Sequence, residues 1–206
     1  MVRPPNDDFA NSIAVTGSSG TVTGSLTGAT VQPGEPVPDA GSGTIWWTWT
    51  APADGTWRFA VEPSGVGLTV WRGTAVDQLT AASTVNCRAG AAGGPYVQAV
   101  AGQQFHLRVH GWDGAVTLSW TPASRPANDA FAAAVPVSGY NGESATSTCL
   151  ATWETGEPQP ALASGQTVWF RWQAPDRVRV VFSTGTDDAV VHIWRGSSVS
   201  ALTAAG

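Results

Sequence analysis

The stretch WWTWTAP at residues 46–52 returns further along the chain as WFRWQAP at residues 169–175. The same offset of 123 residues relates WRG at 71–73 to WRG at 194–196. Repetition at a constant offset is the sequence signature of tandem structural repeats. The Trp-rich stretch therefore predicts the architecture of the chain, which is one fold present twice.

The repeat begins well before the Trp-rich stretch. NDDFA at residues 6–10 corresponds to NDAFA at 128–132, and GEP at 34–36 corresponds to GEP at 156–158, at an offset of 122 residues. One inserted residue in the second copy accounts for the change of offset. Chance does not keep one offset, within a residue, over so many positions, so these are two copies of one domain.

The repeat divides the chain into four parts. Residues 1–5 form a linker-like N-terminus, 6–120 the first β-sandwich repeat, 121–127 a Pro-rich linker, and 128–206 the second repeat. The linker and the N-terminus resemble one another, since both place Arg and Pro directly before the repeat.

The second copy lacks a counterpart for the last part of the first. Residues 96–101, 104–110 and 115–120 are expected to be three strands, and none has an equivalent before residue 206. A sandwich without these strands would expose sheet edges and half a core. Either the natural chain continues past residue 206, or another chain supplies the missing strands.

Apolar residues recur with a period of two, which is typical of strands with one buried face. In residues 105–110, Phe105, Leu107 and Val109 share one face, and the opposite face is expected to be a solvated polar one. Gly- and Pro-rich turns separate such runs. The pattern predicts an all-β fold: tandem antiparallel β-sandwich, jelly-roll-like domains, the second incomplete in this chain. The opposite face of that strand carries His106, Arg108 and His110.

Composition limits the classes of partner. The chain has 206 residues, 42% of them hydrophobic, a net charge of −5 and no Lys. An acidic chain with scattered Arg has no basic stripe for nucleic acid or an anionic membrane. No apolar run approaches the length of a membrane span, so no membrane insertion is expected. We also see no signal peptide at the start of the sequence.

Most of the aromatic residues in the repeated motifs are expected to be structural. Large rings at equivalent places in both copies suit the space between two sheets better than a sugar-binding platform. Two other tryptophans, Trp112 in a Gly-rich turn and Trp153 in place of Val31, are instead candidates for contact with a ligand or partner. The expected core residues are Phe9, Trp46, Trp49, Trp71, Phe131, Trp169, Trp172 and Trp194.

The sequence offers little for catalysis or metal binding. His106 and His110 lie on one strand face without a third ligand nearby, which is a weak zinc signal. Glu35 and Glu157 are duplicated between Gly and Pro, which favours a role in loop architecture over that of a tuned acid. No nucleophile elbow, phosphate loop or CxxC pair is present. We therefore expect no catalytic residue, no metal and no cofactor.

Two cysteines, Cys87 and Cys149, are too few for a disulfide scaffold. Cys149 aligns with Thr27, and the equivalent of Cys87 falls beyond the end of the chain. A bridge repeated within each domain is therefore excluded, and a thiol packed as a small apolar group is the expected state of each.

The string N-D-x-F-A, then G-A-T-x-x-x-G-E-P, W-[WYF]-x-W-x-A-P, W-R-G and L-T resembles a repeat related to bacterial pre-peptidase C-terminal domains. It lies at residues 6–10, 28–36, 46–52, 71–73 and 79–80, and the second copy departs from it with Leu150 in place of the first Gly. The resemblance implies a non-catalytic β-sandwich module of secreted or surface proteins. The repeat is also very similar to repeats in minor tail proteins of phages that infect actinobacteria.

The resemblance leads to three functional hypotheses. The first is a phage virion structural protein, a minor tail protein whose repeats decorate or extend the tail and contact the host surface; a capsid decoration protein is a close variant. Its partners would be other virion proteins in a homo-oligomeric or larger assembly, with a host cell-wall glycan as a further candidate. The second is a secreted carbohydrate-binding or adhesive module of an actinobacterium, at the cell surface. The third is a non-catalytic appendage of an exported hydrolase.

Overall fold

A computed structural model describes residues 2–36, 43–82, 84–85, 94–158, 166–185 and 189–205. The chain forms two compact units, Met1–Ser124 (unit 1) and Arg125–Gly206 (unit 2), each of which is described by itself. The helical elements of the described residues are single 3-10 turns: η1 (Phe9–Asn11), η2 (Val76–Gln78), η3 (Phe131–Ala133) and η4 (Val199–Ala201). None of these is long and apolar enough to cross a membrane.

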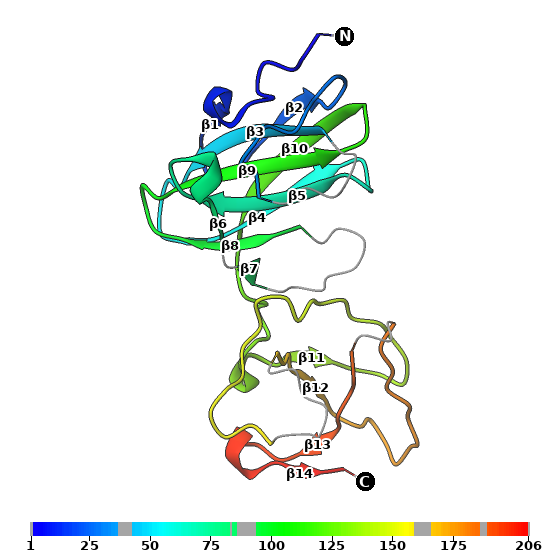
Figure 1. Cartoon of the computed structure of the whole chain (residues 1–206). Coiled ribbons are helices and arrows are strands. Elements are labelled where there is room, and N and C mark those ends of the chain that lie inside the picture. The colour runs from blue at the N-terminus through cyan, green and yellow to red at the C-terminus, as the bar shows by residue number, and fades with distance from the viewer. Residues whose placement is uncertain are drawn as a thin grey trace. The chain divides into compact units, whose positions relative to one another are not determined.

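Unit 1 is an all-β sandwich of two five-stranded sheets with the orders β1-β3-β9-β5-β6 and β2-β10-β4-β8-β7 (Figure 1). The prediction of an all-β, sandwich-like fold is thus confirmed. Its strands are β1 (Ile13–Val15), β2 (Gly20–Ser25), β3 (Gly43–Thr50), β4 (Gly55–Glu62), β5 (Gly67–Arg72), β6 (Thr80–Ala81), β7 (Thr84–Val85), β8 (Tyr96–Ala99), β9 (Gln104–Gly111) and β10 (Ala115–Ala123).

The pairing is antiparallel with one exception in unit 1. β1 runs parallel to β3, with Ile13 opposite Trp47 and Val15 opposite Trp49. The chain passes from β1 to β2 in the other sheet and returns in β3, and this double crossing restores the original direction. The sandwich is therefore mixed at this edge rather than wholly antiparallel.

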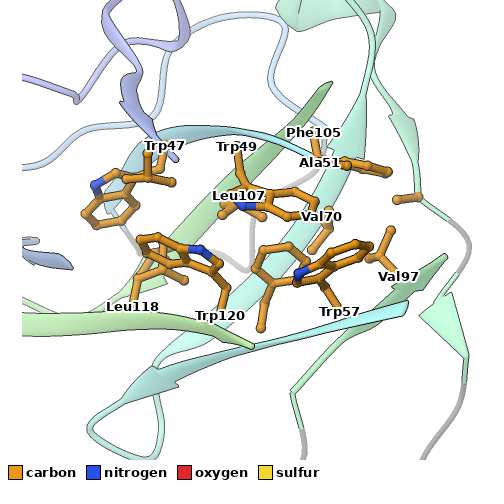
Figure 2. Packing of buried hydrophobic residues seen from close by; sticks show 14 of the residues in the cluster. Trp47, Trp49, Ala51, Trp57, Val70, Val97, Phe105, Leu107, Leu118 and Trp120 are labelled. Atoms are coloured by element: carbon orange, nitrogen blue, oxygen red, sulfur yellow. The ribbon is translucent and has the colours of Figure 1, made fainter. Parts of the chain in front are cut away.

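Alternate residues of the two sheets meet in one core. In the first sheet Trp47 lies opposite Leu107, and Trp49 lies opposite Phe105. Burial of each such side chain contributes about 1.5–3 kcal/mol. Figure 2 shows the two layers facing each other, with Trp47, Trp49, Leu107 and Phe105 on one side and Trp57, Leu118 and Trp120 on the other.

The turn between β1 and β2 accepts hydrogen bonds from the indole N–H groups of three core tryptophans. The carbonyl of Gly17 accepts from Trp49 Nε1 at 3.0 Å and from Trp120 Nε1 at 3.1 Å. The carbonyl of Ser18 accepts from Trp57 Nε1 at 3.0 Å. A hydrogen bond to a buried indole N–H is favourable, so one short turn stabilises three core rings.

Small residues in β2 make room for the indoles. A Cβ atom built on Gly24 would lie 2.8 Å from Cη2 of Trp47, and one built on Gly20 would lie 2.5 Å from Cζ2 of Trp120. Any side chain at these positions would displace a ring. The glycines of β2 are therefore matched to the large side chains opposite them.

The three strands expected near the end of the first repeat are present as β8, β9 and β10. Their ends differ from those expected: β8 ends at Ala99, β9 runs to Gly111, and β10 runs to Ala123, which includes residues expected in the linker. Thr121 pairs with Arg58, and Ala123 pairs with Thr56 of β4. These backbone hydrogen bonds extend the strand past Trp120.

Unit 2 builds parts of the same fold from the second copy of the sequence (Figure 1). Its strands are β11 (Val135–Val137), β12 (Phe170–Trp172), β13 (Trp194–Arg195) and β14 (Thr203–Ala204). β11 pairs in parallel with β12, as β1 does with β3, and β13 pairs antiparallel with β14, as β5 does with β6. Trp172 Nε1 donates to the Gly139 carbonyl at 3.0 Å, which repeats the bond from Trp49 to Gly17.

Candidate functional site

The N-terminal segment of unit 1 is tied to the sheet through a buried aspartate. The carboxylate of Asp7 accepts hydrogen bonds from the backbone N–H of Thr30 at 2.6 Å and from its hydroxyl at 2.8 Å. Arg3 forms an ion pair with the same carboxylate. Bonds to an ionised acceptor are stronger than neutral ones, so this carboxylate holds the N-terminal segment against the loop at residue 30.

Two further residues of the NDDFA motif bind the Trp-rich strand. Asn6 Nδ2 donates to the carbonyl of Trp46 at 2.9 Å, and the backbone N–H of Trp46 donates to the Asn6 carbonyl at 2.9 Å. Phe9 meets the Trp46 ring edge-on, with centroids 5.2 Å apart at 88°. The motif therefore caps the face of the first sheet that points away from the second sheet, here called the outer face.

The GEP loop completes this arrangement. Glu35 Oε1 accepts from the Gln32 backbone N–H at 3.1 Å and from the Thr44 hydroxyl at 2.9 Å. Its side chain is fully buried, and Oε2 lies 3.9 Å from Nη1 of Arg108. We call the set of these residues the clasp of unit 1: Asn6, Asp7, Phe9, Thr30, Glu35, Thr44 and Trp46.

Unit 2 repeats the main contacts of the clasp. Asp129 accepts from the Thr152 N–H at 2.5 Å and from its hydroxyl at 2.9 Å, and Asn128 Nδ2 donates to the Trp169 carbonyl at 3.0 Å. Phe131 meets Trp169 edge-on, with centroids 5.1 Å apart at 85°. The repeated motifs of the sequence are therefore the residues of one structural device.

The second glutamate occupies the same place as the first. Glu157 is buried and accepts from the Glu154 N–H at 3.0 Å and from the Thr167 hydroxyl at 2.8 Å. Trp169 Nε1 also approaches Glu157, at 3.4 Å. Both duplicated glutamates thus bond the start of the Trp-rich stretch, as the interpretation of loop architecture implies.

Trp46 and Trp71 were expected between the two sheets, but both lie on the outer face of the first sheet. Trp46 is fully buried, but strand alternation places it opposite to Trp47 and Trp49, so it lies under Phe9 and outside the space between the sheets. Trp71 is half-buried on the same outer face. The guanidinium of Arg108 lies 5.3 Å from the Trp71 ring centroid and 6.0 Å from that of Trp46, where a cation–π contact is favourable.

Two residues on the polar face of β9 are buried and His110 is half-buried, although the sequence suggested a solvated face. Arg108 and His106 are both buried, because the clasp covers them. His106 Nδ1 lies 3.2 Å from the Thr48 hydroxyl and Nε2 lies 2.9 Å from the Gly73 carbonyl. Burial lowers the pKa of His106, an effect that the bond to the Gly73 carbonyl partly offsets. The signal that could have revealed this is Trp46, an apolar residue on the same side of the first sheet.

The motif aromatics of unit 2 are less buried than expected. The sequence placed Phe131, Trp169, Trp172 and Trp194 in a core, but each is only half-buried. Trp172 does contact Phe182 edge-on, with centroids 5.5 Å apart at 77°, as Trp49 contacts Phe59 in unit 1 at 5.3 Å and 79°. The ring pair is formed, while the strands that bury it in unit 1 have no counterpart among the described residues of unit 2.

The two candidate contact residues differ in exposure. Trp112, in the turn between β9 and β10, is 75% exposed. Trp153 is only half-buried and lies two residues past Ala151, within the clasp loop of unit 2. The structure therefore leaves Trp112 as the indole that a ligand or partner can reach most readily.

No metal site is found in the described ranges, where no group of three or more His, Cys, Asp or Glu could hold an ion. Cys149 is disulfide-bonded, so the expectation of a thiol at this position was wrong. Cys87 lies outside the described residues.

No protein-family model and no curated protein matches the chain. Among the solved structures to which part of the chain is similar are two of PliG, a periplasmic inhibitor of g-type lysozyme. The protein from Aeromonas hydrophila is 16% identical, with a TM-score of 0.37, over 54% of this chain and 96% of that one. The protein from Salmonella Typhimurium is 9% identical, with a TM-score of 0.32, over 54% of this chain and 99% of that one. At these scores neither likeness carries an argument about what this chain binds.

Proposed function

We propose that the chain is a non-catalytic structural protein of a phage virion, a minor tail protein whose sandwich repeats decorate or extend the tail. The duplicated clasp supports this proposal best. Asp7, Glu35, Asp129 and Glu157 all bond backbone or hydroxyl groups of their own repeat. Carboxylates used in this way build a repeated module, so these four are not available as an acid and base for a reaction.

The repetition itself is the second support. Tandem copies of one self-tied module suit a protein that extends a surface by adding units. The resemblance of the motifs to repeats of phage minor tail proteins provides the specific assignment, and placement on the capsid is the close variant. Both variants put the chain in the virion, with other virion proteins as partners.

The test is mass spectrometry of purified virions from the phage that encodes the chain. Peptides from both repeats, at a fixed ratio to the major tail protein, are expected. Antibody labelling in electron micrographs then distinguishes tail from capsid. Absence of the chain from virions that are otherwise complete would refute the proposal.

Exposure of Trp112 favours a second candidate, a carbohydrate-binding or adhesive module. A flat indole stacks on the apolar face of a sugar, and Trp112 is largely exposed in a turn. On an array of actinobacterial cell-wall glycans, the chain would bind and the Trp112→Ala variant would not. Tyr140, an exposed aromatic of unit 2, is the matched control, and Tyr140→Ala should leave binding unchanged. An array without signal would remove this candidate.

A further inference from the structure

His106 lies on the outer face of the first sheet of unit 1, beneath the N-terminal segment. The ring of Phe9, the first residue of η1, lies against the imidazole with centroids 4.5 Å apart at 50°. His106 is only 6% exposed, whereas none of the residues of η1 is itself buried. A turn at the surface therefore forms part of the cover over a buried imidazole.

The partners of the two ring nitrogens fix the tautomer of His106. Nε2 lies 2.9 Å from the carbonyl of Gly73, which can only accept a hydrogen bond. Nε2 of the neutral ring therefore carries the hydrogen, and Nδ1 accepts from the hydroxyl of Thr48 at 3.2 Å. Thr48 donates its only hydroxyl hydrogen there, so in its 2.7 Å bond with Ser12 the Ser12 hydroxyl is the donor.

A directed chain of hydrogen bonds thus joins the end of η1 to strand β9. Ser12, directly after η1, donates to Thr48 of β3, and Thr48 donates to His106. At the start of η1, the ring of Phe9 contacts His106 directly. The neutral imidazole therefore holds the turn at both of its ends.

A second proton on His106 disturbs both contacts. Nδ1 becomes a donor, so the Thr48 hydroxyl must rotate to accept, and the Ser12 hydroxyl loses its acceptor. The imidazolium is also a buried charge, which requires water or a carboxylate beside it. Water reaches it when the turn lifts, and the core between the sheets stays closed because its residues lie on the opposite face.

The charges around His106 do not compensate this proton. β3 and β5 place only uncharged side chains on the outer face, and in the described part of the chain no carboxylate is paired with His106. Burial, partly offset by the Gly73 carbonyl, is what lowers its pKa. The titratable and charged groups of the surrounding elements are Arg108 and His110 on β9, Asp7 and Asp8 before η1, Glu35 in the GEP loop and Asp77 in η2.

Each nearby carboxylate is already engaged or solvated. Asp7 and Asp8 are bound by Arg3. Glu35 faces Arg108, which is itself a like charge two residues along the strand from His106. Asp77 is exposed to solvent. The imidazolium is therefore stabilised by exposure rather than by an ion pair on this face.

We propose that His106 is a proton-operated latch for the η1 turn. With the imidazole neutral, residues 8–12 are held on the outer face of the first sheet. With the imidazole protonated, these residues leave that face while the two sheets remain packed. The inference goes beyond the virion proposal and does not depend on it, because the latch lies within unit 1.

The second copy of the sequence provides an internal control. Ala134 and Arg171 stand at the positions equivalent to Ser12 and Thr48, so the hydrogen-bond chain cannot form there. The turn itself is the same, since the N–H of Ala134 donates to the Phe131 carbonyl at 3.1 Å, as that of Ser12 donates to Phe9. Acid should therefore open η1 and leave η3 closed.

Hydrogen exchange of the 206-residue chain, followed by NMR, measures this opening. The readout is the protection factor of the Ser12 N–H, which corrects for the intrinsic pH dependence of exchange. Between about pH 7.5 and 5.5 it should fall by up to about tenfold, the limit for a histidine whose solvated pKa is about 6.5. Protection of Ala134, and of Leu107 in the core, should not change. An unchanged value at Ser12, or an equal fall at Leu107, would overturn the proposal.

Matched variants identify the titrating group. In His106→Gln, protection of Ser12 should no longer depend on pH. His110, a half-buried histidine of the same strand, is the control, and His110→Gln should keep the full pH dependence. Thr48→Val should lower protection of Ser12 already at neutral pH, because it interrupts the hydrogen-bond chain. A pH dependence that survives in His106→Gln would assign the opening to another group and overturn the proposal.

The tautomer provides a test that does not rely on any variant. Nitrogen NMR spectra of the imidazole at neutral pH should show a protonated Nε2 and an unprotonated Nδ1. The opposite tautomer would reverse the direction of the hydrogen-bond chain and remove the basis of the latch.

Discussion

Asp7 holds Thr30 by two hydrogen bonds, at 2.6 Å to the backbone N–H and 2.8 Å to the hydroxyl, and Asp129 holds Thr152 in the same way. The two residues of each pair are 23 positions apart in the sequence. The bond therefore closes a loop that begins at the first motif of the repeat. It explains why the aspartate and the threonine occur together in both copies.

Removal of this aspartate should destabilise the unit that contains it. Asp7→Ala leaves the partly buried N–H of Thr30 without its acceptor, and we expect a loss of about 2 kcal/mol in the free energy of unfolding of unit 1. Urea unfolding followed by tryptophan fluorescence measures the change. Asp113, an exposed aspartate of the β9–β10 turn, is the control. If Asp113→Ala costs as much as Asp7→Ala, the clasp is not what holds the N-terminal segment.

The second copy departs from the motif at Leu150, and we expect that restoring Gly there increases stability. Gly28 has a φ of 74°, and Leu150 at the equivalent position has a φ of 63°. A non-glycine residue in this left-handed region costs about 1–2 kcal/mol. Leu150→Gly should therefore stabilise unit 2, by about 0.5–1 kcal/mol after loss of the leucine's partial burial. The reverse change, Gly28→Leu, should destabilise unit 1, and both are measured by urea unfolding. A loss of stability in Leu150→Gly would contradict the argument from strain.

The lowered pKa of His106 predicts a pH dependence with a definite sign. The unfolded chain takes up a proton on this histidine near pH 6.5, whereas the folded chain does so only at lower pH. Between the two values the unfolded state binds more protons, so stability falls as pH decreases below about 6.5. His106→Gln should reduce the slope of unfolding free energy against pH between about 7 and 5. An unchanged slope would show that other groups carry the acid sensitivity.

Truncation of two tryptophans should change stability by very different amounts. Trp47 is completely buried, and Trp47→Ala should cost about 3–5 kcal/mol through loss of burial and creation of a cavity. Trp112 is largely exposed, and Trp112→Ala should change the unfolding free energy by no more than about 0.5 kcal/mol. Thermal unfolding of both variants makes the comparison. A large effect at Trp112 would mean that its ring supports the fold rather than a contact surface.

The period-two pattern of the sequence was sufficient to predict which side chains of β9 lie between the two sheets. Phe105, Leu107 and Val109 alternate along β9, and all three lie between the sheets as expected. Periodicity failed on the other face of the same strand, because the clasp covers it. Whether Arg108 meets water or Glu35 depends on a loop some 70 residues earlier, and a pattern within the strand carries no information about that loop.

The motif aromatics also show that local contacts follow from the sequence while burial does not. Identical motif positions become completely buried at Trp49 and only half-buried at Trp172, because the covering strands β9 and β10 are found in unit 1. The local contacts of each indole are nevertheless alike, including the 3.0 Å bond to the Gly17 or Gly139 carbonyl. Local geometry follows from the repeated sequence, whereas burial is a property of everything that packs around it.

The sequence by itself determined the repeat, the all-β class and the residues that belong to one device in each copy, because a constant offset and a period of two are local, one-dimensional signals. The tertiary structure alone decided which face Trp46 occupies, that His106 and Arg108 are buried, and that β12 and β13 belong to separate sheets in the described part of unit 2. These facts depend on contacts between segments far apart in the chain, and such contacts exist only once the sheets have formed.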